Sequence, residues 1–224
     1  MQVTASRPVG ASAILFDLDG VLIDSSWAIA ESINRTLLDA GRPAAVPSVI
    51  RGLIGMPLHD IFEWLGCGSG SALDKYVAAY RAEYELVAPS QTTVVAGVPE
   101  VLEALSPRHR LAVATTKPLE VARPILAGLG LDRFFAGIFG PSLAARSESK
   151  LVTLSRATEA LKPLEPLALV GDRRFDVFAA RHANITAVGA LWGYGTRQEL
   201  QDAGAHVLVS EPADLLGVDF AASR

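Results

Sequence analysis

Short apolar runs that alternate with longer helix-like stretches are the feature that most constrains how this chain can fold. The runs are nearly continuous in apolar residues, which is typical of strands buried on both faces of a sheet. They predict strands at 12–16, 111–115, 136–140, 167–171, 185–191 and 206–210. The stretches between them predict helices at 99–105, 118–129, 150–161 and 174–183. Strands and helices in this order indicate an α/β fold with a doubly wound, mostly parallel sheet.

The alternation is interrupted directly after the first strand. The interrupting stretch has no convincing strand, but apolar residues at helical spacing predict helices at 27–40, 57–65 and 71–87. A helical insertion at this point would lie over the carboxyl ends of the strands, where open α/β sheets bind ligands. We therefore expect an α-helical cap domain at 24–95, inserted into a core domain made of 1–23 and 96–224.

The composition argues against several classes of protein. With a formal net charge of −4, the 224-residue chain is not suited to broad binding of nucleic-acid polymers, although it leaves room for a local cationic pocket. The single cysteine, Cys67, excludes an internal disulfide framework and fits a reducing compartment. Because neither a secretory leader nor an apolar run of bilayer length is evident, we expect a cytoplasmic protein with no membrane partner. The sequence carries no signal for an oligomeric state.

Two carboxylates follow the first predicted strand, in the stretch ILFDLDGVLIDS. Asp17 and Asp19 are two residues apart, so an extended backbone would project both to one side, and Gly20 permits a sharp departure from the strand. One acid could serve as a nucleophile or metal ligand and the other as a general acid or base. The alternative is a strand end with two solvated acids and a turn.

A second pair of acids follows another predicted strand, in LALVGDRRFD. Asp172 lies near the start of the next helix, and Asp176 lies one turn further along it. The alternative interpretation is that Asp172 caps the helix and Asp176 is an exposed acid. Since both pairs fall at carboxyl ends of parallel strands, together they would form an all-oxygen pocket, which suits Mg²⁺ rather than zinc.

Positive charge and hydroxyl groups that could hold an anion follow other strands of the core. Thr115, Thr116 and the helix start that comes after them could bind a phosphate, although a plain capped helix also fits. Lys150 opens a helix, where a lysine is slightly unfavourable, so either a ligand role or an ordinary exposed lysine fits. In the cap, Arg51 could clamp a carboxylate or second phosphate, or could be a solvated helix residue.

Taken in order, these motifs resemble those of the haloacid dehalogenase (HAD) superfamily. DLDGVLIDS resembles its first motif, Thr115 in VATTKP the hydroxyl of the second, Lys150 the lysine of the third, and GDRRFD the fourth. The helical insertion resembles the cap of the phosphoglycolate-phosphatase-like branch. The resemblance implies a Rossmann-like core sheet and covers nearly the whole chain.

The resemblance also implies a role for each residue. Asp17 would attack phosphorus and form an aspartyl-phosphate, while Asp19 would protonate the leaving oxygen and then help to activate water. Mg²⁺ would be held by the Asp17 carboxylate, the Asp19 main-chain carbonyl and Asp172, with Asp176 binding directly or through water. Thr115 and Lys150 would hold the phosphoryl oxygens.

The same resemblance implies a phosphatase that acts on a small phosphorylated metabolite, with 2-phosphoglycolate first and a nucleoside monophosphate second. The second acid, Asp19, argues against the dehalogenases of the superfamily. In the third motif Lys150 is followed by Leu151 instead of proline, as in a subset of phosphoglycolate-phosphatase-like and 5′-nucleotidase-like members. A β-phosphoglucomutase-like phosphomutase and a non-catalytic phosphate-binding protein are the alternatives. The loop WGYGTRQEL, 192–200, either shapes the site or is a plain turn.

Overall fold

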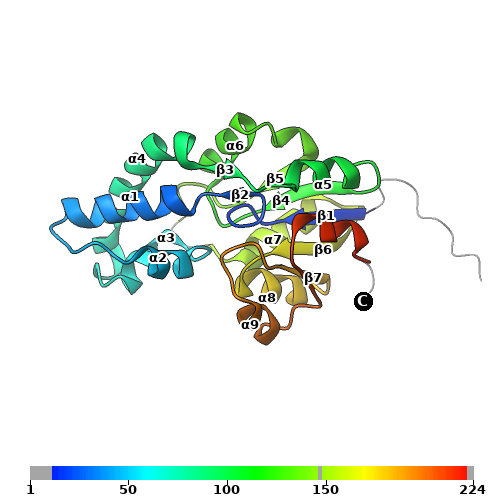
Figure 1. Cartoon of the computed structure of the whole chain (residues 1–224). Coiled ribbons are helices and arrows are strands. Elements are labelled where there is room, and N and C mark those ends of the chain that lie inside the picture. The colour runs from blue at the N-terminus through cyan, green and yellow to red at the C-terminus, as the bar shows by residue number, and fades with distance from the viewer. Residues whose placement is uncertain (1–11, 146–147, 221–224) are drawn as a thin grey trace, which may run out of the picture.

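A six-stranded parallel sheet forms the centre of the molecule in the computed structural model, which describes residues 12–145 and 148–220 (Figure 1). Its strand order is β5-β4-β1-β6-β7-β8, and every neighbouring pair is parallel. The strands are β1 Ser12–Phe16, β4 Arg110–Ala114, β5 Phe135–Phe139, β6 Glu165–Gly171, β7 Thr186–Ala190 and β8 Val207–Val209. The predicted doubly wound sheet is therefore confirmed, with strand ends within two residues of those expected.

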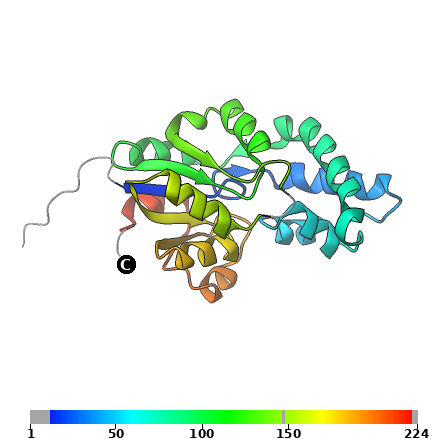
Figure 2. The same cartoon turned by 180° about the vertical axis from the view of Figure 1, so that it is seen from behind.

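Helices cover both faces of this sheet (Figures 1 and 2). Alternate residues of β1 point to opposite sides, so that Ile14 packs in one apolar cluster and Leu15 in the other. The first cluster includes side chains of α5 Val98–Leu105, α6 Leu119–Gly128 and the 3-10 turn η3 Pro212–Gly217. The second includes side chains of α7 Lys150–Ala160, α8 Arg174–His182 and α9 Arg197–Asp202. The short 3-10 turn η2 Asp132–Phe134 leads into β5.

A separate group of helices extends beyond one end of the sheet (Figures 1 and 2). This helical unit consists of α1 Ser26–Asp39, α2 Pro47–Leu53, α3 Leu58–Trp64, the 3-10 turn η1 Gly70–Leu73 and α4 Asp74–Gln91. It has its own apolar cluster, in which Tyr76, Tyr80 and Tyr84 lie on one face of α4 because four residues span about one helical turn. We propose that this unit is the cap expected at 24–95.

Three details differ from the sequence-based predictions. The expectation of no strand in 24–95 is wrong at its ends, because β2 Ile23–Asp24 and β3 Thr93–Val94 form a short antiparallel pair where the chain enters and leaves the helical unit. Two-residue strands carry too little alternation to be seen in a sequence. Helices α2 and α9 were not expected either, since one is short and the other almost wholly polar.

Among the described residues, no helix combines the length and the apolar character that a bilayer crossing requires.

Candidate active site

Three strands deliver the site residues to one edge of the sheet. Asp17 follows β1, Thr115 follows β4 and Asp172 follows β6. These strands are neighbours, and the chain leaves β1 towards β4 but returns from β5 to β6, on the opposite side. Such a reversal of strand order opens a crevice at the carboxyl ends of the strands, which is where ligands bind in folds of this type.

Lys150 joins two of the predicted acids. Its Nζ lies 2.6 Å from Asp17 Oδ1 and 2.8 Å from Asp176 Oδ1, and it donates a hydrogen bond of 2.8 Å to the carbonyl oxygen of Ala114. All three charged side chains are buried. This burial excludes the alternative interpretation of Lys150 as an ordinary exposed lysine. Lys150 opens α7, and Ser149 caps that helix by accepting from the Val152 N–H.

Burial sets the ionisation of this cluster. It disfavours the charged carboxylate of Asp17, and the negative charges of Asp176 and Asp19 add to that effect, so the pKa of Asp17 rises to about 7 even though Lys150 opposes the rise. Burial also disfavours the charged ammonium of Lys150, but Asp17 and Asp176 outweigh it and raise the pKa of Lys150. Lys150 is therefore held as a fixed cation at neutral pH.

Asp172 has an unused oxygen inside the site. Its Oδ2 accepts a hydrogen bond of 2.6 Å from the Tyr194 N–H, whereas Oδ1 is buried and has no hydrogen-bond partner among the described residues. Burial, followed by the charges of Asp176 and Asp17, raises the pKa of Asp172 well above its usual value. A buried carboxylate oxygen without a partner is costly unless a ligand occupies it.

The carboxylates of Asp17, Asp172 and Asp176 offer oxygen atoms that all lie within 4.8 Å of one another. This donor set contains only oxygen, carries high negative charge and includes Asp172 Oδ1, which has no partner in the described part of the chain. Those properties fit a hard cation such as Mg²⁺. Asp176 also accepts a hydrogen bond from the Arg173 N–H through Oδ2, so it caps α8 as well as facing the site.

Asp19 belongs to a different set of contacts. Lys117 Nζ donates to both of its carboxylate oxygens, at 2.9 and 3.1 Å, and the Ser25 hydroxyl donates to Oδ1. The ammonium of Lys117 also lies 4.6 Å from the centre of the Tyr84 ring, which belongs to the helical unit. Burial opposes the charge on Lys117, but Asp19 outweighs it and raises the pKa of Lys117. The two predicted acids of DLDG thus face different cations.

The predicted phosphate-binding threonines lie at the start of the loop after β4. Thr115 is buried, and its Oγ1 accepts a hydrogen bond of 3.1 Å from the Lys117 N–H. Thr116 donates from Oγ1 to the carbonyl oxygen of Gly55, at 3.4 Å, and so bridges the core and the helical unit. Thr115 lies beside the Asp17–Lys150 cluster, because Lys150 contacts the preceding carbonyl of Ala114.

Two arginines hold the helical unit against the core. The buried Arg173 donates to the carbonyl oxygens of Ile54 and, at 2.8 Å, Gly52, and pairs with Glu199 at 3.0 Å. Arg51 donates to the Gly193 carbonyl oxygen at 3.3 Å and lies over the Tyr194 ring.

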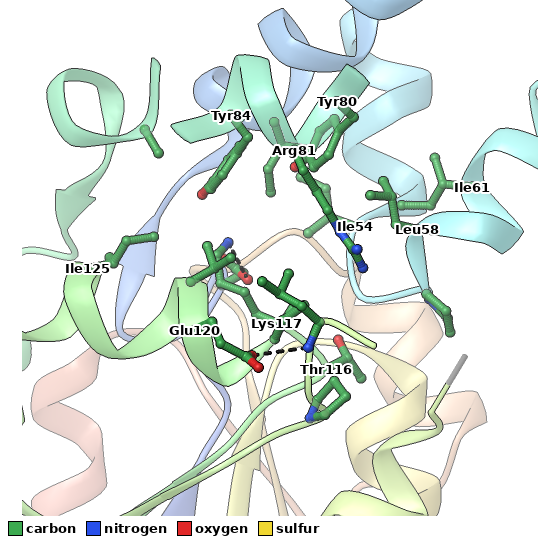
Figure 3. A pocket seen from close by; sticks show the side chains of 18 of the residues that line it. Ile54, Leu58, Ile61, Tyr80, Arg81, Tyr84, Thr116, Lys117, Glu120 and Ile125 are labelled. Atoms are coloured by element: carbon green, nitrogen blue, oxygen red, sulfur yellow. Dashed lines mark hydrogen bonds and ion pairs between the residues drawn. The ribbon is translucent and has the colours of Figure 1, made fainter. Parts of the chain in front are cut away.

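A cavity of about 390 Å³ lies between the helical unit and the core (Figure 3). Asp19, Thr116 and Lys117 line its core side, and Tyr80 and Tyr84 of α4 line the side of the helical unit. Arg51, the cap residue predicted to contact substrate, is not among the described residues that line it. Asp17, Lys150, Asp172 and Asp176 form one buried cluster. Asp19 and Thr116 line the cavity, whereas Arg51 contacts Gly193 and the Tyr194 ring.

Sequence reasoning assigned no role to several residues that shape the site. Lys117 lies within VATTKP and Ser25 ends DLDGVLIDS, but neither residue was expected to contact Asp19. Tyr194 lies in the loop 192–200, which the sequence left as either part of the site or a plain turn. The hydrogen bond from its N–H to Asp172 shows that the loop shapes the site. The Tyr194 hydroxyl also donates to Asp24 Oδ1 at 3.0 Å. The spacing of these residues along the chain carries no signal for such contacts.

Comparison with known proteins gives the family. Residues 14–190 match the family described as haloacid dehalogenase-like hydrolase. The tyrosine-protein kinase PtkA of Mycobacterium tuberculosis is 33% identical over 204 residues, which are 90% of this chain and 69% of PtkA. A 5′-nucleotidase of Pseudomonas aeruginosa is 33% identical, over 90% of this chain and 91% of the relative. A phosphoglycolate phosphatase of Colwellia psychrerythraea is 30% identical, over 85% and 89%.

A solved structure gives the same result. A haloacid dehalogenase-like hydrolase from Streptococcus pneumoniae superposes with a TM-score of 0.83 and 29% identity, covering 92% of this chain and 97% of that one. The match extends over the sheet and the helical unit together. The chain belongs to the haloacid dehalogenase-like hydrolase family and is an enzyme of its phosphatase type.

Proposed function

We propose that this enzyme is a Mg²⁺-dependent phosphomonoesterase that works through an aspartyl-phosphate on Asp17. The observation that carries the proposal is the buried contact of Asp17 with Lys150, next to the unpartnered Oδ1 of Asp172. A nucleophilic carboxylate, a fixed cation and a group of metal-binding oxygens are what transfer of a phosphoryl group requires.

Asp17, Asp172 and Asp176 would hold Mg²⁺ through their carboxylates, together with the main-chain carbonyl of Asp19 that the family resemblance implies. When bound, the ion neutralises charge on the transferring phosphoryl group and on the carboxylates around it. The buried Asp172 oxygen supports this assignment, because the cation would supply the partner that it lacks.

The chain's own residues account for the proton and bond changes. An Asp17 carboxylate oxygen attacks phosphorus, and the bond from phosphorus to the leaving oxygen breaks as Asp19 donates a proton to that oxygen. Asp19 then accepts a proton from water, which attacks phosphorus and breaks the bond to Asp17. Lys150 and the groups at Thr115 and Thr116 stabilise the phosphoryl oxygens throughout. Free alcohol and inorganic phosphate leave.

The substrate is a small phosphorylated metabolite. The relatives named phosphoglycolate phosphatase and 5′-nucleotidase support starting with 2-phosphoglycolate and with nucleoside monophosphates. A β-phosphoglucomutase-like phosphomutase would use the same aspartates, but it would return the phosphoryl group to a sugar phosphate instead of water.

Phosphate release from a panel of metabolite and aryl phosphates tests this proposal. In Mg²⁺ the wild type releases phosphate, whereas EDTA and Asp17→Asn each abolish release. Asp39→Asn, on the exposed side of α1, is the matched control and keeps full activity. Activity that survives in Asp17→Asn would contradict the mechanism. Isomerisation of a sugar phosphate that depends on added bisphosphate, with negligible phosphate release, would identify a phosphomutase.

A further inference from the structure

The cavity between the helical unit and the core has a mostly apolar wall. Ile54, Leu58 and Ile61 enter it from the helical unit, and Ile125 enters it from α6 (Figure 3). The rings of Tyr80 and Tyr84 in α4, stacked with their centres 5.5 Å apart, also line the side of the helical unit. Its volume of about 390 Å³ falls in the range of roughly 300–1,000 Å³ that is typical of sites for drug-sized ligands.

The position of Asp19 decides which part of a substrate enters this cavity. Asp19 lines the cavity, whereas Asp17 and Lys150 are not among the described residues that do so. An acid that protonates a leaving oxygen must lie within about 2.6–3.2 Å of it. With the phosphoryl group at Asp17 and the leaving oxygen at Asp19, the rest of the leaving alcohol extends into the apolar space.

A small charged alcohol matches this wall poorly. The glycolate portion of 2-phosphoglycolate ends in a carboxylate and would leave most of the apolar surface in contact with water. Two long cations line the cavity among the described residues, and one of them, Lys117, is already paired with Asp19. Arg81 extends into the cavity from α4 and has no ion pair among the described residues, so it is the group that would favour an acidic substrate (Figure 3).

We propose that the substrate is a phosphate monoester whose alcohol is a largely apolar body, the size of an aromatic ring or larger, that fills this cavity. This substrate class rests on the proposed phosphomonoesterase function. It follows from the hydrophobic effect, in which each methylene moved from water into an apolar site gains about 0.8 kcal/mol, equivalent to roughly a fourfold change in an equilibrium.

A series of n-alkyl phosphates tests the proposal without changing the chemistry. Ethyl, butyl and hexyl phosphate have leaving alcohols of similar acidity, so differences in kcat/KM report burial of the chain. We expect kcat/KM to rise about threefold or more per methylene, and both hexyl and benzyl phosphate to exceed 2-phosphoglycolate at least tenfold. A flat or falling series, or 2-phosphoglycolate as the best substrate, overturns the proposal.

Two substitutions connect the trend to this cavity. Leu58→Asn places an amide in the apolar wall and should flatten the dependence on chain length. Leu86→Asn, on the outer surface of α4 where Leu86 is 75% exposed, should leave the dependence intact. Arg81→Met should preserve the preference for apolar alcohols. If it instead removes a preference for 2-phosphoglycolate, the cavity selects acidic substrates and the proposal is wrong.

Binding of n-alkylphosphonates separates this proposal from the proposed function. These compounds carry no cleavable ester, so their affinity, measured by calorimetry in Mg²⁺, reports the cavity even if nothing is hydrolysed. Affinity that rises with chain length in the wild type and less in Leu58→Asn supports the apolar site. Phosphate release without any dependence on chain length supports the phosphatase and overturns the substrate class.

Discussion

The ammonium of Lys117 donates hydrogen bonds to both carboxylate oxygens of Asp19, at 2.9 and 3.1 Å, and lies 4.6 Å from the centre of the Tyr84 ring. The proposed proton donor is therefore oriented by a lysine that also touches the helical unit. Burial opposes the charge on Lys117, but the negative charge of Asp19 outweighs it and raises the pKa of Lys117, so the ammonium is charged at neutral pH.

Replacing that lysine should impair catalysis more than binding. In Lys117→Met, Asp19 loses its charged partner, and a hydrogen bond to a charged group contributes about 1.5–3 kcal/mol. We expect kcat to fall by about tenfold to a hundredfold, with a smaller change in KM, in steady-state kinetics. Lys162→Met, which removes an exposed lysine paired with Glu159, is the control. An unchanged kcat would show that Asp19 needs no orientation by Lys117.

The raised pKa of Asp17 predicts how the metal-free protein responds to pH. An aspartate near pKa 4 when unfolded and about 7 when folded binds its proton more tightly in the folded state. Its contribution to stability is fully present below about pH 4 and is lost as pH rises through 7. The free energy of unfolding in EDTA should therefore fall between pH 5 and pH 7, by up to about 1.4 kcal/mol per pH unit from this group.

Urea denaturation at pH 5, 6 and 7 measures this slope. In Asp17→Asn the titrating group is gone and the slope should flatten, whereas the exposed substitution Asp39→Asn should leave it as in the wild type. The raised pKa of Asp172 acts in the same direction, so part of the slope should remain. Equal slopes in Asp17→Asn and the wild type would show that Asp17 does not titrate in this range.

Removal of the carboxylate charge at Asp172 should abolish the response to Mg²⁺. A ligand at about a hundred times its dissociation constant stabilises a folded protein by about 2.7 kcal/mol. The wild type should thus melt several degrees higher in saturating Mg²⁺ than in EDTA, and Asp172→Asn should show no such difference. Asp202→Asn at the end of α9 is the control. A full shift in Asp172→Asn would mean that the ion binds elsewhere.

Close packing around Asp172 makes Gly195 sensitive to substitution. A Cβ at this position would lie 1.9 Å from the carbonyl oxygen of Asp172, which cannot move without moving the site. Gly195→Ala should cost at least about 2 kcal/mol of stability and should weaken the Mg²⁺-induced thermal shift. Gly128→Ala, in α6 with no atom within 4 Å of the added Cβ, should be neutral or slightly stabilising. Equal unfolding free energies for the two variants would exclude this steric account.

Much of the fold could be predicted because its signals are local. The apolar run SAILF is enough to predict a buried strand without any other part of the chain. The ends of β1 and β6 then determine where the acids that follow them lie. Parallel strands then bring those acids to one edge, which is why Asp17 and Asp172 could be paired across the sequence.

The remaining contacts depend on the path of loops and on how the helical unit packs. Nothing near Asp172 in the sequence indicates that the N–H of Tyr194 reaches its carboxylate. Arg51 in α2 was considered as a substrate contact or as a solvated helix residue, and nothing in the sequence indicates that it reaches Gly193 and the Tyr194 ring. Arg173, which holds the helical unit against the core, lies in GDRRFD. Only the two acids of that motif were assigned a role from the sequence.

Arg173 should control how tightly the helical unit packs against the core beside the cavity. It donates to the carbonyl oxygens of Ile54 and Gly52 and pairs with Glu199, and Ile54 itself lines the cavity. In Arg173→Met these partners lose their donor, and breaking a buried ion pair costs about 3–5 kcal/mol when one partner is removed. Since Glu199 is half-buried, we expect the lower part of that range.

The kinetic consequence should be a rise in KM of about tenfold, with a smaller effect on kcat, because a loosened wall binds the leaving alcohol less well while Asp17 and Lys150 stay in place. Limited proteolysis should also cut the chain between α2 and α3 faster. Arg174→Met is the matched control, since the neighbouring arginine is more exposed and lies 3.8 Å from the same Glu199. If Arg174→Met reproduces both effects, the contacts of Arg173 with the helical unit are not their cause.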